Sequence, residues 1–237
     1  KVYQEWDVAL DLEVAWKGSL EWFKNDNENK RMLKQVKLIQ GFGSKAEIIS
    51  KEEALEYEPN VLINQKFITK SSRDGEINPV KAIKKMLQQI VTSGGRVIFP
   101  EELLKVTTNK RGVIAKTSQG LIEADTIIYA CGTSSNVVAR GKYLKSPTPG
   151  LIVTSKPFKQ IIHKILVGPG VHVYQRKDGV VILGEQGTPP SNHDLRLSKR
   201  PEEFPDQKLS IEHGLRIVNL ATKFIPQFKD LQIETVD

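Results

Sequence analysis

The clearest periodicity in the chain lies at residues 80–91, where apolar side chains recur three or four positions apart. This spacing is typical of an amphipathic helix. Asn78-Pro79 supplies an N-cap followed by proline at the first helical position, and Gly94-Gly95 follows the run. We therefore predict one helix between these two signals.

Similar signals predict three further helices. The first covers residues 1–24. The second follows the capping box Ser50-Lys51-Glu52-Glu53 and ends before Pro59, and the third runs from Ser210 to Pro226.

Runs rich in β-branched residues predict strands in much of the remaining sequence. Residues 126–130 form a continuous apolar run that ends at Cys131-Gly132, which is typical of a buried strand. One part of the predicted fold carries a helix, a small antiparallel unit and this buried strand, and the other part is a mostly antiparallel sheet, so the fold class is α+β. The predicted strands cover residues 36–42, 96–99, 103–108, 113–117, 121–124, 126–130, 151–155, 161–167, 171–176 and 180–183.

The 237-residue chain is long enough for one large domain or two smaller ones. Hydrophobic residues make up 39% and charged residues 27%, as in soluble globular proteins. No run of 18 apolar residues is present, so we expect no membrane span. The single cysteine, Cys131, excludes an internal disulfide framework and a cysteine-rich zinc site, and we predict no metal site. It fits a reducing compartment, so we expect the cytoplasm or an organelle matrix.

The net charge of +7 is concentrated in one segment. Residues 139–177 contain eight lysines and arginines and no aspartate or glutamate. Such a segment could attract nucleic acid, but no aromatic interleaving or nucleic-acid motif accompanies it. We interpret these residues as solvated strand and loop positions, and we do not expect nucleic acid as a partner.

Two ordered motifs carry a family resemblance. The first runs from Asp74-Gly75-Glu76-Ile77-Asn78-Pro79 through the predicted helix to Ala124-Asp125-Thr126-Ile127-Ile128-Tyr129-Ala130-Cys131-Gly132. The second is Tyr174-Gln175-Arg176-Lys177-Asp178-Gly179, with glutamine where proline is usual. Their order and spacing resemble the central portion of the D-amino acid oxidase and glycine oxidase superfamily of FAD-dependent oxidoreductases, from about Ser50 to Ile225.

The resemblance implies part of a two-domain flavoprotein. Residues 1–73 and 147–225 would form the substrate domain, with its mostly antiparallel sheet. Residues 74–146 would belong to the FAD-binding α/β domain, and residues 226–237 would begin the return to it.

The resemblance also implies site residues. Beside the FAD it implies Leu103, Ala130, Gly132 and Thr133. A glycine at the end of a strand lets backbone amides approach the cofactor. On the substrate side it implies Tyr174, as an aromatic over the substrate, and Arg176, as a guanidinium that orients a carboxylate.

Each of these residues also has a purely structural interpretation. Gly132 would end a buried strand, Tyr174 would be an ordinary strand tyrosine, and Arg176 would be a charge beside the following turn. His172 is a possible base, although a strand histidine without function is the simpler interpretation. We expect Cys131 to be a small buried core residue rather than a flavin attachment point.

One motif of complete family members is missing. They open with Gly-x-Gly-x-x-Gly and a helix whose N-terminus holds the FAD pyrophosphate, and this motif occurs nowhere in the chain. A family stretch that brings the carboxylate-binding arginine would follow Asp237. We therefore expect the chain to be a fragment that binds FAD poorly alone.

The resemblance implies oxidation of the C–N bond of a small amine or amino acid, with hydride transfer to the flavin. One alternative is a flavoenzyme domain that acts on a modified tRNA base, for which the basic segment is the hint. Another is a non-catalytic remnant without flavin. Related flavoenzymes oxidise hydroxy acids or glycerol phosphate, so the sequence leaves the exact substrate, the electron acceptor and the oligomeric state undecided.

Overall fold

The computed structural model describes residues 2–110, 112–132, 151–186 and 207–237. The described residues form two compact units. The first contains residues 2–83, 151–186 and 207–237, and the second contains residues 84–110 and 112–132.

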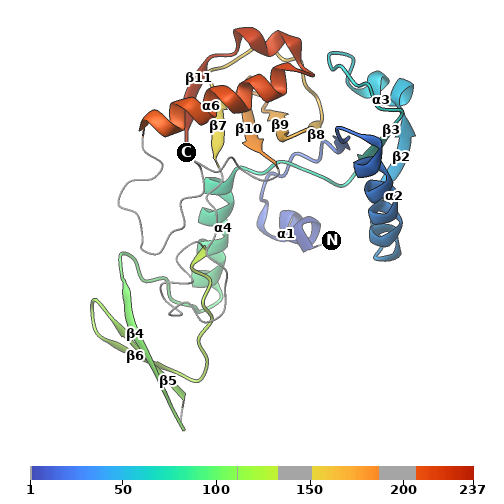
Figure 1. Cartoon of the computed structure of the whole chain (residues 1–237). Helices are drawn as coiled ribbons and strands as arrows, with labels where there is room; N and C mark the ends of the chain where they lie inside the picture. Colours follow the sequence, from blue (N-terminus) through green and yellow to red (C-terminus); the bar gives the residue numbers. More distant parts are fainter. Residues whose placement is uncertain (1, 111, 133–150, 187–206) are drawn as a thin grey trace. The chain divides into compact units, whose positions relative to one another are not determined.

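A mixed eight-stranded sheet dominates the first unit, in the order β11-β7-β10-β9-β8-β1-β3-β2 (Figure 1). All neighbouring strands are antiparallel except β1 and β8, which run parallel. This β1–β8 pairing joins the N-terminal part of the chain to the strands that follow residue 150. The strands are β1 (Ser19–Glu21), β2 (Glu47–Ser50), β3 (Phe67–Ser71), β7 (Ile152–Ser155), β8 (Ile165–Gly168), β9 (Val171–Gln175), β10 (Val181–Glu185) and β11 (Ile233–Val236).

One face of this sheet packs against α6 (Gln207–Thr222), which lies across the strands in Figure 1. In β9, Val171 and Val173 are buried, whereas His172 and Tyr174 are partly exposed. This alternation is typical of a strand with one covered face. These valines pack in one core cluster with Ile217 of α6 and with Phe228 of the 3₁₀-helix η3 (Pro226–Asp230). Burying one such side chain contributes about 1.5–3 kcal/mol.

Three further helices belong to the first unit: α1 (Val2–Leu10), α2 (Asp26–Gly41) and α3 (Lys51–Tyr57). The capping box predicts the start of α3 correctly, because the Ser50 hydroxyl accepts a hydrogen bond from the Glu53 amide at 3.1 Å.

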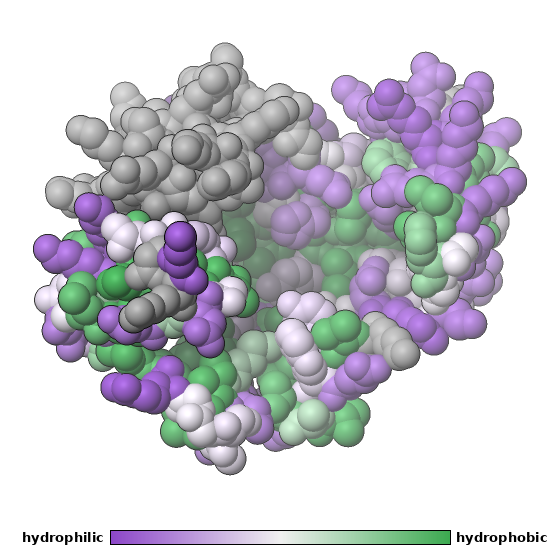
Figure 2. Space-filling view, turned by 90° about the horizontal axis from the view of Figure 1, so that it is seen from below, coloured by the Kyte–Doolittle hydropathy of each residue, from purple (hydrophilic) through white to green (hydrophobic). Residues whose placement is uncertain are grey.

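The second unit holds a three-stranded antiparallel sheet of β4 (Leu103–Asn109), β5 (Gly112–Thr117) and β6 (Leu121–Ala124), as the sequence predicts. Helix α4 (Pro79–Thr92) begins in the first unit and ends in the second. The Asn78 side chain caps α4 by accepting from the Lys81 amide at 3.1 Å, which confirms the predicted N-cap. Hydrophobic residues lie on the surface of the protein in the view of Figure 2. In the second unit, Phe99 is 90% exposed.

Two helix–strand assignments from the sequence are wrong. Only residues 2–10 of the predicted helix 1–24 are helical, and residues 19–21 form β1. The predicted strand 36–42 lies almost entirely within α2. The Asn25 side chain caps α2, and Met32 and Val36 fall at helical spacing and pack with Ala46. Tertiary packing therefore decides the structure of these short apolar runs.

The predicted strands at 96–99 and 126–130 are also wrong. Neither segment is a strand, and Ile128 is 85% exposed. No strand among the described residues pairs with residues 126–130, so the backbone N–H and C=O groups of this segment make no strand-to-strand hydrogen bonds with those residues. The α+β fold class is confirmed. No described helix is both long enough and apolar enough to span a membrane.

Candidate active site

The sheet face opposite α6 carries the candidate active-site residues, and we call it the open face. His172 and Tyr174 of β9 alternate with the buried valines and therefore point to this face. Register places Ile182 opposite Tyr174 and Gly184 opposite His172. Because Val167 pairs with both His172 and Glu21, the side chain of Glu21 lies on the same face.

His172 lies directly over Gly184. A Cβ atom built at position 184 would approach the imidazole Cε1 to 2.1 Å and Nε2 to 2.3 Å, so only glycine leaves room for the ring. Burial lowers the pKa of His172 below its usual value of 6.5. The ring is therefore neutral at neutral pH and keeps one nitrogen as a proton acceptor.

The phenol of Tyr174 is half-buried and lies near the carboxylate of Glu76. Burial raises the pKa of Tyr174, the negative charge of Glu76 raises it further, and Arg176 opposes the shift. The hydroxyl therefore stays protonated at neutral pH and can donate a hydrogen bond. The Arg176 guanidinium pairs with Asp178 in the adjacent turn.

An ion pair between Lys17 and Glu76 lies near these side chains. The Lys17 Nζ is 2.9 Å from the Glu76 Oε1, and the two side chains are 16% and 12% exposed. Lys17 also donates to the backbone oxygen of Gln175 at 2.5 Å, which ties this ion pair to the end of β9. The other Glu76 oxygen is buried without a hydrogen-bond partner among the described residues.

The Asp74-Gly75-Glu76 motif positions these carboxylates. The backbones of Ala15 and Glu76 exchange hydrogen bonds of 2.9 and 3.0 Å. A Cβ at Gly75 would lie 2.8 Å from the Val14 side chain, so glycine is required for this close approach. Asp74 accepts from the Ser19 hydroxyl. Burial raises the pKa of Glu21, and the charge of Asp74 raises it further.

The residues assigned to FAD lie in the second unit. Leu103 begins β4, an edge strand of the small sheet. Ala130 and Gly132 lie in the exposed segment that follows β6, and Thr133 lies outside the described residues. Cys131 is exposed, so the expectation that it is a buried core residue is wrong.

The substrate-side candidates Tyr174 and Arg176 lie in the first unit. Sequence reasoning missed Lys17 and Glu21, because it assigned residues 1–24 to a helix. The alternation of polar Lys17, Ser19 and Glu21 with Leu20 and Trp22 is the period-2 signal that could have found them.

The structure describes five of the eight lysines and arginines of the basic segment. Its arginines and lysines at 140, 142 and 145 lie outside the described residues. Lys164 lies 5.5 Å from the ring centre of Tyr57, and Arg176 pairs with Asp178. These local partners fit the interpretation of ordinary strand and loop positions.

The first unit thus has a mixed, mostly antiparallel sheet with one face covered by α6, and the second unit has a small antiparallel sheet, which gives the α+β fold class that the motifs imply. The model of the FAD dependent oxidoreductase family matches residues 2–236. The chain therefore belongs to this family, whose cofactor is FAD. None of the curated proteins searched matches the chain in sequence.

Solved structures share the fold. L-proline dehydrogenase from P. horikoshii has a TM-score of 0.81 at 19% identity, covering 99% of this chain and 63% of that one. Glycine oxidase from Geobacillus kaustophilus has a TM-score of 0.75 at 15% identity, with 99% and 62% covered. L-amino acid deaminase from Proteus vulgaris has a TM-score of 0.74 at 13% identity, and the match covers 99% of this chain and 67% of the deaminase. The chain thus spans a little under two thirds of the first two proteins.

The segment after β6 is mostly exposed among the described residues. Gly132 has a φ of +52°, a left-handed conformation that favours glycine. Among the described residues, no heavy atom lies within 4 Å of a Cβ built there. Ile128 and Tyr129, which precede it, present exposed apolar surface.

Proposed function

We propose that this protein oxidises the C–N bond of a small amine or amino acid with FAD as the hydride acceptor. The observation that carries the proposal is the open face, where His172 and Tyr174 lie on the same strand close to the Lys17–Glu76 pair. The proteins that share the fold are named for chemistry on proline, glycine and other amino acids.

The side chains of the open face suit an amine substrate. Glu21, Asp74 and Glu76 outnumber Lys17, so the local field favours a cationic ammonium group. His172, kept neutral by burial, can take the proton that an ammonium must lose before its C–H bond breaks. The protonated Tyr174 hydroxyl can donate to a substrate carboxylate, with Arg176 as a further donor if it leaves Asp178.

When bound, FAD would accept the hydride from the carbon next to nitrogen, which leaves an imine that water hydrolyses. Backbone groups of Leu103, Ala130, Gly132 and Thr133 would hold the cofactor, as the family resemblance implies. The open conformation at Gly132 supports this assignment.

The experiment that tests the reaction type compares amine and hydroxy substrates with the same carbon skeleton. The FAD-loaded protein is mixed without oxygen with L-alanine or glycine, and separately with their hydroxy counterparts lactate or glycolate. We expect flavin absorption to bleach with at least one amino acid, with formation of the imine hydrolysis product. Bleaching by the hydroxy acids alone would overturn C–N oxidation.

A further inference from the structure

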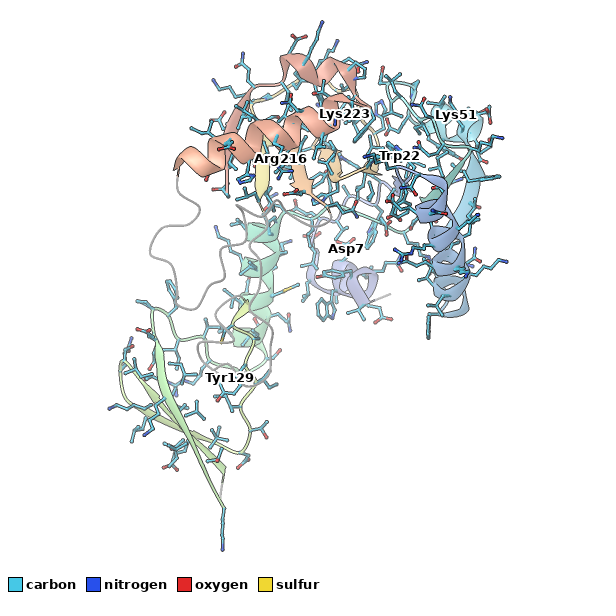
Figure 3. All side chains as sticks on the ribbon, viewed as in Figure 1. Asp7, Trp22, Lys51, Tyr129, Arg216 and Lys223 are labelled. Atoms are coloured by element: carbon cyan, nitrogen blue, oxygen red, sulfur yellow. The ribbon has the colours of Figure 1, made fainter. Side chains whose placement is uncertain are left out.

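A concave site lies apart from His172 and Tyr174, neither of which is among its lining residues. It is a groove of about 800 Å³ between α2, the β8–β9 turn and the residues that end α6. Trp22 and Lys223, both labelled in Figure 3, line it from the ends of β1 and α6. All of its lining residues belong to the first unit.

The floor of the groove is apolar and well packed. Trp22 is 2% exposed, Phe224 is 4% exposed, and their rings meet edge to face with centres 5.2 Å apart. Met32, Leu62 and Leu220 extend the apolar lining. The backbone amide of Leu62 donates to the Phe224 oxygen at 2.8 Å, which fixes the wall on this side.

The rim of the groove is cationic. Lys24, which precedes α2, Arg31 of α2, and Lys223, which follows α6, are among its lining residues. Glu28 is the carboxylate among the lining residues, and its two oxygens accept from the Lys24 amide and from the Asn25 side chain, both at 3.1 Å. The rim therefore has an excess of positive charge over an apolar floor.

The β8–β9 turn keeps the groove open. A Cβ at Gly168 would lie 2.6 Å from the Phe224 ring, and a Cβ at Gly170 would lie 3.5 Å from Leu220. A side chain at either position would therefore press on the floor or fill the space above it. Gly170, with φ of +85°, also has a backbone that favours glycine.

We propose that this groove binds an amphiphilic carboxylate, a small molecule with an anionic head and an aliphatic or aromatic body. Its volume lies within the range of small-molecule sites, roughly 300–1,000 Å³. The apolar floor matches the body, and the three cations match the head. The proposal does not depend on the flavin reaction, because none of the open-face residues His172, Tyr174 and Glu76 lines the groove.

The test is a titration of the full ¹⁵N-labelled chain with decanoate, followed through backbone amide signals. We expect shifts at Gly168, Gly170 and the Trp22 indole. Decyltrimethylammonium, which has the same tail and a positive head, should bind at least about tenfold more weakly, because the rim repels it.

Charge-reversal variants locate the binding site. Arg31→Glu combined with Lys223→Glu should weaken decanoate binding about tenfold or more, since each removed cation contributes a several-fold effect at a partly exposed site. The matched control is Lys34→Glu with Lys51→Glu, on α2 and α3 outside the groove, and it should bind decanoate as the unmodified chain does.

Four outcomes would overturn the proposal. The first is equal binding of the two surfactants, and the second is equal loss of affinity in both double variants. The third is a set of shifts confined to the exposed apolar residues of the second unit. If a glutamate-rich amphipathic peptide shifted the glycine signals while decanoate did not, the groove would be a peptide site and the small-ligand assignment would fail.

Discussion

At the residue scale, single positions of the open face depend on neighbours that touch them directly. Gly184 is the sharpest case, because the His172 imidazole occupies the space that any side chain there would need. The strand that carries His172 also holds Gln175, which is fully buried yet polar. These two positions, and the buried carboxylate of Glu58, each give a testable consequence.

Gly184→Ala should displace His172. The added methyl group would have to push the ring aside, at a cost of about 1–3 kcal/mol in stability, and a displaced catalytic side chain lowers kcat/KM by about tenfold or more. Steady-state kinetics with the best amine substrate and urea unfolding measure both effects. Gly41→Ala is the control, because no atom lies within 4 Å of its Cβ position. Unchanged kinetics in Gly184→Ala would contradict the assignment.

Gln175 organises the segment before β8. Its Oε1 accepts from the amides of Ile161 and Ile162 at 2.9 and 3.2 Å, and its Nε2 donates to three backbone oxygens. Gln175→Leu should lower the free energy of unfolding by about 3 kcal/mol or more, because buried backbone groups lose their partners. The exposed Gln88→Leu should change it by less than about 0.5 kcal/mol. Equal stability of the two variants would refute this role.

Glu58 gives a prediction for pH. It is fully buried, and burial raises its pKa above 4.5 although His163 and Lys164 amides donate to it. The folded state then holds this proton more tightly than the unfolded state, so its contribution to stability is lost as pH rises from 4.5 through the raised pKa. Glu58→Gln should therefore gain stability relative to the natural protein over that window and keep the gain above it. Urea unfolding at several pH values measures it, and the opposite slope would contradict the pKa shift.

At the element scale, the sequence predicts those helices and strands that carry their own boundary signals. The Asn78-Pro79 and Gly94-Gly95 signals bracket α4, and the turns between β4, β5 and β6 separate these strands correctly. Residues 36–42 carry a strand-like run but belong to a helix, because Asn25 starts that helix eleven positions upstream. Residues 126–130 resemble a buried strand but have no pairing strand among the described residues.

The Asn25 cap tests the corrected assignment of α2. Its Oδ1 accepts from the amides of Asn27 and Glu28 at 3.1 Å. Asn25→Ala should lower the free energy of unfolding by about 1 kcal/mol and reduce helical circular dichroism, because two helix amides lose their acceptor. The exposed Asn27→Ala is the matched control and should have a much smaller effect. Identical behaviour of the two variants would argue against the cap.

At the scale of the whole molecule, the sequence motifs identify the family correctly, because the order and spacing of the motifs match the family even where a single residue differs. Only part of the candidate site could be predicted from these sequence motifs. Tyr174 and Arg176 belong to a recognisable strand-and-turn motif, whereas Lys17 and Glu21 reach the open face only through the β1–β8 pairing, which joins segments about 145 residues apart. The period-2 alternation at residues 17–22 can indicate a strand, but no local pattern indicates which strand it pairs with. The assignments to FAD of Leu103, Ala130, Gly132 and Thr133 stay predictions.

The most direct measurement is the absorption spectrum of the protein expressed from its own gene and purified without added flavin, before and after anaerobic addition of an amino acid. Our account expects the two-band flavin spectrum, its bleaching by the amino acid, and slower bleaching in Tyr174→Phe, which loses the hydrogen-bond donor on the open face. A protein that carries no flavin and takes none up from added FAD would contradict the central claim.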